Sequence, residues 1–391
     1  MTAETTPANA VLTIDLAAVV ANWRLLQRLV APAACAAVVK ADAYGLGVAP
    51  VARALHRAGC RTFFVACLAE AVALRPHVAD SAIYVLAGVP PGCEDAFVRH
   101  QLRPVLNSLI DIAAWRGFAN RTASAPPVAI HFDTGMSRLG LPPDEAARVR
   151  DEPDRLDGVA VACVMSHLAC ADQPDHPLNA RQQAAFAGLR QRWPGVQMSL
   201  AASSGIFLGP AWHGDLCRPG LALYGGAPVP GRTNPMTQVV DLRARILQVR
   251  EIDPGWSVGY GATHHARRRA TIATAGVGYG DGYLRSLSNR GHGYIGDIRV
   301  PLVGRVSMDL ITFDASAVPA ALLAPGTEVE LIGPHIGIDA VAADAGTIAY
   351  EILTSLGGRY RRVYRGGVDG PSERDAATGA DADGLEANGG R

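Results

Sequence analysis

The sequence predicts an α/β protein in which an N-terminal (β/α)8 barrel, residues 1–236, is followed by a mostly-β domain, residues 237–366. Two observations support this fold class. Up to residue 235, short apolar runs alternate with stretches of helical spacing, and after Thr237 short apolar units are separated by Gly and Asp turns. Residues 1–11 are expected to form a flexible or edge segment. Residues 367–391 contain almost no side chains to bury, which predicts a disordered tail.

Eight apolar runs supply the predicted barrel strands. They are residues 35–40, 62–66, 82–87, 103–106, 128–132, 161–166, 197–201 and 221–225. Between most of them lie helical patterns, such as residues 16–29 and 178–193, with apolar side chains at i, i+3, i+4 and i+7. This alternation fits a closed barrel, although a doubly wound open sheet gives the same periodicity.

The second domain is predicted from four β-rich stretches and one helix. The stretches are residues 242–252, 269–283, 294–313 and 327–333. Residues 338–356 have the composition of a single late helix.

The composition excludes several classes of partner and site. Lys plus Arg and Asp plus Glu number 36 each, so no net basic charge favours nucleic acid or an acidic membrane surface. The seven cysteines are scattered without a CxxC pair, which argues against disulfides and a structural zinc site, and no metal is expected. Neither a signal peptide nor an apolar stretch of about 20 residues is present. A cytoplasmic protein is the expectation.

Lys40 stands at the carboxyl end of the first predicted strand, which is the active-site end in a barrel. Desolvation there lowers a lysine pKa, and a neutral amine forms a Schiff base with a carbonyl compound. Position alone leaves a second interpretation open, in which Lys40 pairs with Asp42 at the rim.

The loops at the predicted strands 7 and 8 favour a phosphate. Ser203-Ser204-Gly205 ends the seventh strand, and Arg218-Pro219-Gly220 precedes the eighth. Hydroxyl groups and backbone N–H groups beside glycine bind phosphate monoesters. A lysine for an aldehyde and a cradle for a phosphate together point to pyridoxal 5′-phosphate.

Seven motifs, in order along the chain, resemble those of the alanine racemase family. They are VVKADAYGLG (38–47), DTGMSRLG (133–140), MSHLACAD (165–172), RPGLALYG (218–225), SVGYGATH (257–264), VGYGDGY (277–283) and GRVSMDL (304–310). The resemblance runs from Val11 to Tyr364. It implies a barrel that binds pyridoxal phosphate, a β-rich domain, and a head-to-tail homodimer with shared active sites.

The resemblance also implies roles for individual residues. Lys40 matches the lysine that holds the cofactor and acts as a base on one face of the substrate, and Tyr260 matches the opposing base from the other subunit. Arg218 matches the arginine facing the pyridine nitrogen, and His167 the histidine that supports it. The phosphate contacts match Tyr44, Ser203, Gly220 and Leu221; the substrate contacts match Arg138, Met308 and, at the entryway, Tyr279.

Four positions depart from the family pattern. Ala202 replaces an asparagine at the cofactor site, and His131 replaces a lysine that is carbamylated in some members, so no such modification is expected. Ser307 stands where some members have cysteine. Gly358 aligns with a tyrosine that touches the phosphate in some members, with Tyr360 close by.

The expected function is therefore the racemisation of alanine to supply D-alanine for peptidoglycan. A broader racemase that also accepts serine and a decarboxylase relative are alternatives among enzymes. A carrier of the cofactor without turnover is the alternative outside enzymes, but small carriers of that kind lack the β-rich domain.

Overall fold

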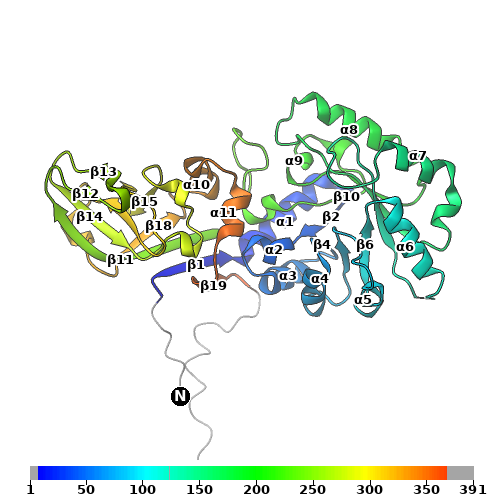
Figure 1. The fold of residues 1–391 in the computed structure, drawn as a ribbon, viewed down its shortest axis with the longest axis horizontal. Helices are drawn as coiled ribbons and strands as arrows, with labels where there is room; N and C mark the ends of the chain where they lie inside the picture. The colour runs from blue at the N-terminus through cyan, green and yellow to red at the C-terminus, as the bar shows by residue number, and fades with distance from the viewer. Residues whose placement is uncertain (1–7, 123, 368–391) are drawn as a thin grey trace, which may run out of the picture.

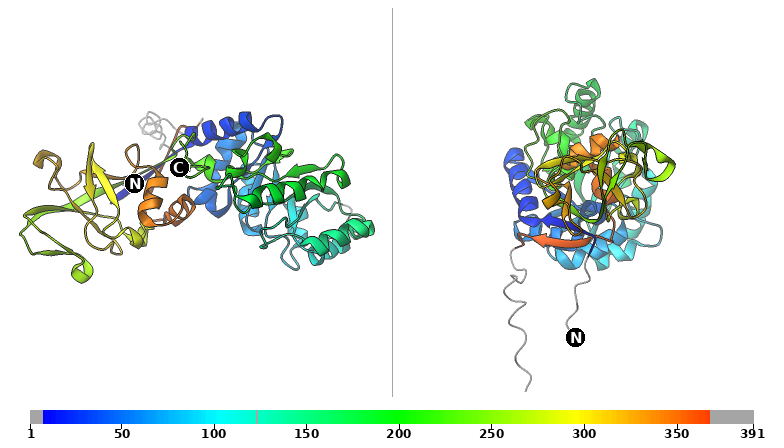
Figure 2. Two further views of the ribbon diagram at one scale, coloured as in Figure 1. Left: turned by 90° about the horizontal axis from the view of Figure 1, so that it is seen from above. Right: turned by 90° about the vertical axis from the view of Figure 1, so that its left-hand side faces the viewer.

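The computed structural model describes residues 8–122 and 124–367. It shows an elongated molecule with the barrel at one end and the β-rich domain at the other, and helix α11 (Ala349–Ser355) lies near their junction (Figures 1 and 2). One hydrophobic core runs through both parts, from Ala10 to Tyr360. The predicted tail lies outside the described residues except for Gly367.

The barrel is built from parallel strands. Seven of them form a sheet in the order β3-β4-β5-β6-β7-β8-β9. The barrel strands are β2 (Ala34–Cys35), β3 (Ala37–Val38), β4 (Thr62–Val65), β5 (Ala82–Val85), β6 (Leu102–Leu106), β7 (Val128–His131), β8 (Val161–Met165), β9 (Gln197–Ser199) and β10 (Leu216–Cys217).

The strand that closes the barrel is β10, and the prediction of a strand at residues 221–225 was wrong. Strand β10 pairs in parallel with β2, and the Arg218 N–H donates to the Ala201 carbonyl beyond β9. Residues Leu221–Tyr224 form a 3₁₀ helix that ends at Gly225 in the left-handed conformation. Arg218 and Gly220 therefore follow the last strand and lie at the carboxyl end of the barrel.

Helices surround the barrel strands (Figure 1). The N-terminus of α1 is capped by Asp15, whose side chain accepts a hydrogen bond from the Ala18 N–H at 2.9 Å, and α6 is capped in the same way by Ser108. The helices are α1 (Leu16–Val30), α2 (Lys40–Tyr44), α3 (Val48–Arg57), α4 (Leu68–Leu74), α5 (Glu94–Arg99), α6 (Leu109–Ala119), α7 (Pro143–Asp151), α8 (Pro177–Ala187) and α9 (Ser203–Ile206).

The second domain is an antiparallel assembly around the long strand β11 (Val240–Ile252). The sheet order is β16-β15-β18-β11-β1-β19, and β14 pairs with β11 and β17. Its other strands are β12 (Ser257–Val258), β13 (His264–His265), β14 (Ala270–Ala275), β15 (His292–Ile295), β16 (Ile298–Pro301), β17 (Ile311–Asp314), β18 (Glu328–Ile332) and β19 (Arg361–Arg365).

Strand β1 (Ala10–Asp15) ties the start of the chain to this second sheet. It pairs antiparallel with β11 and parallel with β19. Ala10 and Val11, which the sequence assigned to a flexible or edge segment, thus lie in a strand with partners on both sides. The alternation of buried and half-buried residues along β1 favours this position, since one face packs on the core.

The single helix predicted for residues 338–356 is two helices, α10 (Ile338–Ala345) and α11. Gly346 breaks the pattern, because it takes the left-handed conformation at φ 71° and its N–H caps α10. No helix in the described ranges is both long and apolar enough to cross a lipid bilayer.

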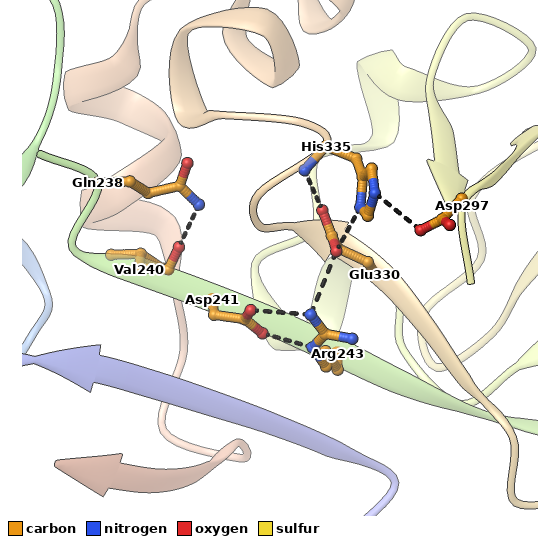
Figure 3. A network of polar contacts seen from close by, with 7 residues as sticks. All are labelled: Gln238, Val240, Asp241, Arg243, Asp297, Glu330 and His335. Carbon is orange, nitrogen blue, oxygen red and sulfur yellow. Dashed lines mark hydrogen bonds and ion pairs between the residues drawn. The ribbon is translucent and has the colours of Figure 1, made fainter. Parts of the chain in front are cut away.

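A buried carboxylate holds several strands of the second domain together (Figure 3). Glu330 on β18 is 3% exposed and accepts hydrogen bonds from the His335 N–H at 2.7 Å and from Arg243 at 3.2 Å. The His335 ring lies 3.1 Å from Glu330 and 3.2 Å from Asp297. Arg243 is also paired with Asp241 at 2.8 Å. The negative charge of buried Glu330 is therefore balanced by His335 on one side and by Arg243 on the other.

Protonation of His335 is expected to stabilise this domain. Its hydrogen bond with Glu330 raises the pKa of His335 above the ordinary value. A raised folded-state pKa gives stability that is complete below the unfolded pKa, about 6.5, and is lost as pH rises through the folded value. His335→Asn should therefore lower the melting temperature in mildly acidic buffer and much less in alkaline buffer.

Exposed His265 on β13 supplies the control, because His265→Asn should shift the melting temperature little at either pH. A loss of stability in His335→Asn that is the same at both pH values would contradict the prediction.

Candidate active site

One large cavity, about 1090 Å³, opens at the carboxyl ends of the barrel strands. Eight residues predicted from the sequence line it together: Lys40, Tyr44, Arg138, His167, Ser203, Arg218, Gly220 and Leu221. A barrel brings strand ends from distant parts of the sequence to one mouth, which explains this convergence.

Lys40 lies two residues beyond the end of β3 and is half-buried in the cavity. Burial lowers the pKa of its amine, the positive charge of Arg138 lowers it further, and Glu70 opposes both. Lys40 is also the only lysine in the chain, which has 35 arginines. A guanidinium cannot form a Schiff base, whereas the amine of lysine can. The presence of one lysine among 35 arginines therefore indicates amine chemistry at Lys40, an indication that the motifs alone do not give.

The cradle at the barrel mouth is formed by Ser203 and the segment after β10. The Ser203 hydroxyl oxygen accepts hydrogen bonds from the N–H groups of Gly220 at 3.0 Å and Ala222 at 3.2 Å, which leaves its own hydrogen free to donate. A Cβ on Gly220 would lie 2.1 Å from the Tyr44 hydroxyl. Only glycine therefore leaves room for that hydroxyl beside the backbone, an arrangement that fits a phosphate group.

Arg218 is fixed in the floor of the cavity and is 4% exposed. Its guanidinium donates to Ser199 Oγ at 2.5 Å and to the Ser166 carbonyl at 2.7 Å. Burial lowers the pKa of Arg218 to about 10, so the side chain stays protonated at neutral pH. These contacts make Arg218 a rigid positive charge.

His167 is neutral and has a defined tautomer. Burial, reinforced by the charge of Arg218, lowers the pKa of His167 to about 3. Its Nδ1 lies 3.5 Å from Arg218 Nη2. Because a guanidinium only donates, Nδ1 is the acceptor and the ring hydrogen is on Nε2.

Arg138 is placed by the loop that follows β7. Asp133 turns this loop by accepting hydrogen bonds from the N–H groups of Gly135 at 2.8 Å and Met136 at 2.9 Å. Burial opposes the ionisation of Asp133, but these bonds hold its pKa below the ordinary value. The exposed Arg138 side chain thus borders the cavity from an ordered turn.

The structure reveals cavity residues that sequence reasoning missed. Tyr350 on α11 lines the cavity with its ring 5.9 Å from that of Tyr44, whereas Gly358, the position aligned with a phosphate tyrosine, does not. Gln182 on α8, behind the cavity wall, joins the loops after β7 and β8, since its amide donates to the Thr134 hydroxyl at 3.3 Å and to the His167 carbonyl at 2.9 Å. The sequence of α8 mixes polar and apolar residues, so it does not indicate which polar side chain turns toward the barrel loops.

Two departures from the family pattern lie in the cavity wall, Ala202 and His131. His131 Nδ1 is 2.9 Å from Asn107 Oδ1, and burial lowers the pKa of His131 to about 4. Ser307 lies outside the cavity, and its hydroxyl donates to the Leu310 carbonyl at 2.7 Å.

The remaining three predicted residues do not line the cavity of their own chain. Tyr260, Tyr279 and Met308 belong to the second domain and are 73%, 43% and 54% exposed. Tyr279 and Met308 lie on neighbouring loops, because the Tyr279 N–H donates to the Ser307 carbonyl at 3.0 Å and the Gly280 N–H to the Met308 carbonyl at 2.9 Å. Exposed large side chains of this kind are typical of interfaces.

Known proteins match the whole of this architecture. The family model "Alanine racemase, N-terminal domain" matches residues 14–228, and "Alanine racemase, C-terminal domain" matches residues 239–364.

Individual relatives cover nearly the full chain. The alanine racemase of Rhodospirillum rubrum is 52% identical over 368 residues, which are 94% of this chain and 98% of the relative. A catabolic alanine racemase of Mesorhizobium japonicum is 49% identical over 92% of this chain and 94% of its own. The crystal structure of alanine racemase from Bartonella henselae, with covalently bound pyridoxal phosphate, has a TM-score of 0.87 and 43% identity, covering 92% of this chain and 100% of that chain. This chain therefore belongs to the alanine racemase family.

Proposed function

We propose that the protein interconverts L- and D-alanine by moving the α-proton between two bases, Lys40 of one subunit and Tyr260 of the other. Its family makes it an enzyme that racemises alanine and depends on pyridoxal 5′-phosphate. The two bases, the shared site and the biological role are the proposal. The observation that carries it is the single lysine of the chain, held in one cavity with Ser203, Gly220 and Arg218.

The cavity residues fit this cofactor. When bound, the cofactor supplies an electron sink for the negative charge that develops at the α-carbon. Lys40 would hold its aldehyde carbon, while the Ser203 hydroxyl and the backbone at Gly220 and Leu221 would hold its phosphate beside Tyr44. The lowered pKa of Lys40 makes its amine better suited to accept and return a proton than an exposed lysine.

Arg218 is the residue that would select racemisation. It stays protonated and has no acceptor, so beside the pyridine nitrogen it disfavours a second positive charge on the ring. A weaker electron sink leaves the charge on the α-carbon, where a proton returns from either face. A decarboxylase benefits from the opposite arrangement, which makes that alternative the weaker one.

A homodimer with shared sites explains the second domain. A second base must reach the face of the α-carbon opposite Lys40, yet Tyr260 is exposed and outside the cavity of its own chain. We infer that Tyr260, Tyr279 and Met308 enter the partner's cavity, with the Met308 N–H and Arg138 binding the substrate carboxylate. A cofactor carrier without turnover would have no use for these residues.

The biological role follows from the product. We propose that the enzyme supplies D-alanine for peptidoglycan in the cytoplasm, where its seven free cysteines stay reduced. A broader racemase that also accepts serine is the second candidate. Racemisation assays across the amino acids would separate the two.

The proposal is tested at Lys40. After incubation with pyridoxal phosphate, we expect a visible absorption band that borohydride abolishes, with one adduct at Lys40 in the mass spectrum. The enzyme should also exchange the α-hydrogen of alanine with solvent deuterium. Because the chain has one lysine, the N-terminal amine is its only competitor, and Lys40→Arg is the matched control. An active protein with no adduct at Lys40 would refute the assignment.

A further inference from the structure

The backbone after Lys40 has a conformation that needs outside support. Four successive residues, Ala41, Asp42, Ala43 and Tyr44, have φ between 52° and 57°, and none is glycine. Left-handed backbone costs about 1–2 kcal/mol per residue in L-amino acids. The turn therefore persists only where its surroundings impose it.

One contact within the barrel and one from the second domain hold the far end of this turn. The Asp42 side chain accepts a hydrogen bond from the Val48 N–H at 2.7 Å, and the Tyr364 hydroxyl on β19 donates to the Leu46 carbonyl at 3.0 Å. None of these contacts reaches the peptide that joins Lys40 to Ala41.

Glu70 holds the end beside Lys40. One carboxylate oxygen accepts a hydrogen bond from the Ala41 N–H at 2.8 Å, and the other accepts from the Ala66 N–H at 2.7 Å. The half-buried Glu70 side chain, on α4, thus clamps the segments that follow β3 and β4. Hydrogen bonds from backbone N–H groups to a carboxylate are among the stronger neutral–charged contacts.

We propose that Glu70 is a positioning residue: its carboxylate fixes the Lys40–Ala41 peptide in the left-handed turn and so directs the Lys40 amine into the cavity. The inference rests on the proposed function, because it concerns the residue that would bind the cofactor. Glu70 also acts electrostatically, since its negative charge supports the protonated form of Lys40 against burial and Arg138.

The single lysine makes this proposal directly measurable. Lys40–Ala41 is the only peptide in the chain with lysine at its carbonyl side, so carbonyl-¹³C lysine combined with ¹⁵N alanine isolates one amide signal in NMR spectra. Lysine labelled with ¹³C at Cε reports the pKa of the Lys40 amine. Both measurements work on the protein without added cofactor.

In Glu70→Ala we expect faster solvent exchange of the Ala41 amide, a lower Lys40 pKa, and kcat for alanine reduced about tenfold or more with a smaller change in KM. Glu70→Gln, which keeps one acceptor oxygen, should be intermediate and covers the case in which the alanine variant does not fold. Glu145→Gln is the matched control, because Glu145 also accepts a backbone hydrogen bond, from the Leu109 N–H at 2.9 Å, outside the cavity.

Unchanged kcat in Glu70→Ala would overturn the proposal. So would a reduced kcat with the Ala41 exchange rate and the Lys40 pKa as in the wild type. An inactive wild-type protein would instead count against the proposed function, and the two NMR measurements would still decide the role of Glu70.

Discussion

Replacing Tyr260 with phenylalanine is expected to lower the rate of alanine racemisation by about 10³-fold, because a positioned general acid–base group contributes roughly 10²–10⁴-fold. The change removes one hydroxyl from a side chain that is 73% exposed in its own chain, so folding and cofactor binding should be unaffected. Exchange of the α-hydrogen with solvent should survive for only one enantiomer of alanine, the one whose hydrogen faces Lys40.

Circular dichroism, the cofactor absorption band and kcat are the measurements for this variant. Tyr294→Phe removes a hydroxyl from β15 of the same domain and should leave kcat near the wild-type value. Full activity in Tyr260→Phe would place the second base elsewhere.

Mixing two inactive chains tests whether the site is shared. A dimer of Lys40→Ala and Tyr260→Phe chains has one site in which both Lys40 and Tyr260 are intact. When equal amounts of the two chains refold together and pair at random, about half of the dimers are mixed. Each mixed dimer has one working site of two, so about a quarter of the wild-type activity should return. Lack of recovery in a sample shown to contain mixed dimers would mean that each chain carries its own second base.

Much of the fold could be predicted from periodicity, and the exceptions have local causes. The run 221–225 is as apolar as a strand, but it is a 3₁₀ helix bounded by Gly220 and Gly225. The true closing strand, β10, has two residues, which is too short for a periodic signal. Strand β1 joins the second domain through pairings with residues more than 200 positions away, which no window of sequence can detect.

The cavity residues could be predicted because they lie in motifs at strand ends. Tyr350 could not, since its sequence pattern is that of an ordinary core helix, and the pattern of residues 338–356 predicts one helix although Gly346 separates α11 from α10. Glu70 carried no motif at all, because its contacts are with backbone N–H groups that any sequence provides. Tyr260 is a different case: the role proposed for it requires a second chain, and the structure describes one chain.

Replacing Arg218 with glutamate should change which reaction is catalysed as well as slow racemisation. Arg218 is a buried cation whose guanidinium is held by Ser199 and Ser166. A carboxylate in its place would accept a hydrogen bond from a protonated pyridine nitrogen, which strengthens the electron sink and favours protonation of the cofactor carbon. Alanine should then give pyruvate in a slow single turnover: its α-carbon is oxidised to a ketone, and the cofactor aldehyde is reduced to the amine.

Pyruvate formation and racemisation are measured on the same sample. We expect racemisation to fall by about 10²-fold or more, in line with the loss of a positioned charged group in a dry site, and pyruvate to reach about one equivalent per bound cofactor. Arg218→Lys is the control, because it keeps a cation and should produce no more pyruvate than the wild type. A folded, cofactor-loaded glutamate variant that produces no pyruvate would show that the charge at position 218 does not select the reaction. Arg218 would then link the burial of a cation in the cavity floor to the choice between racemisation and transamination.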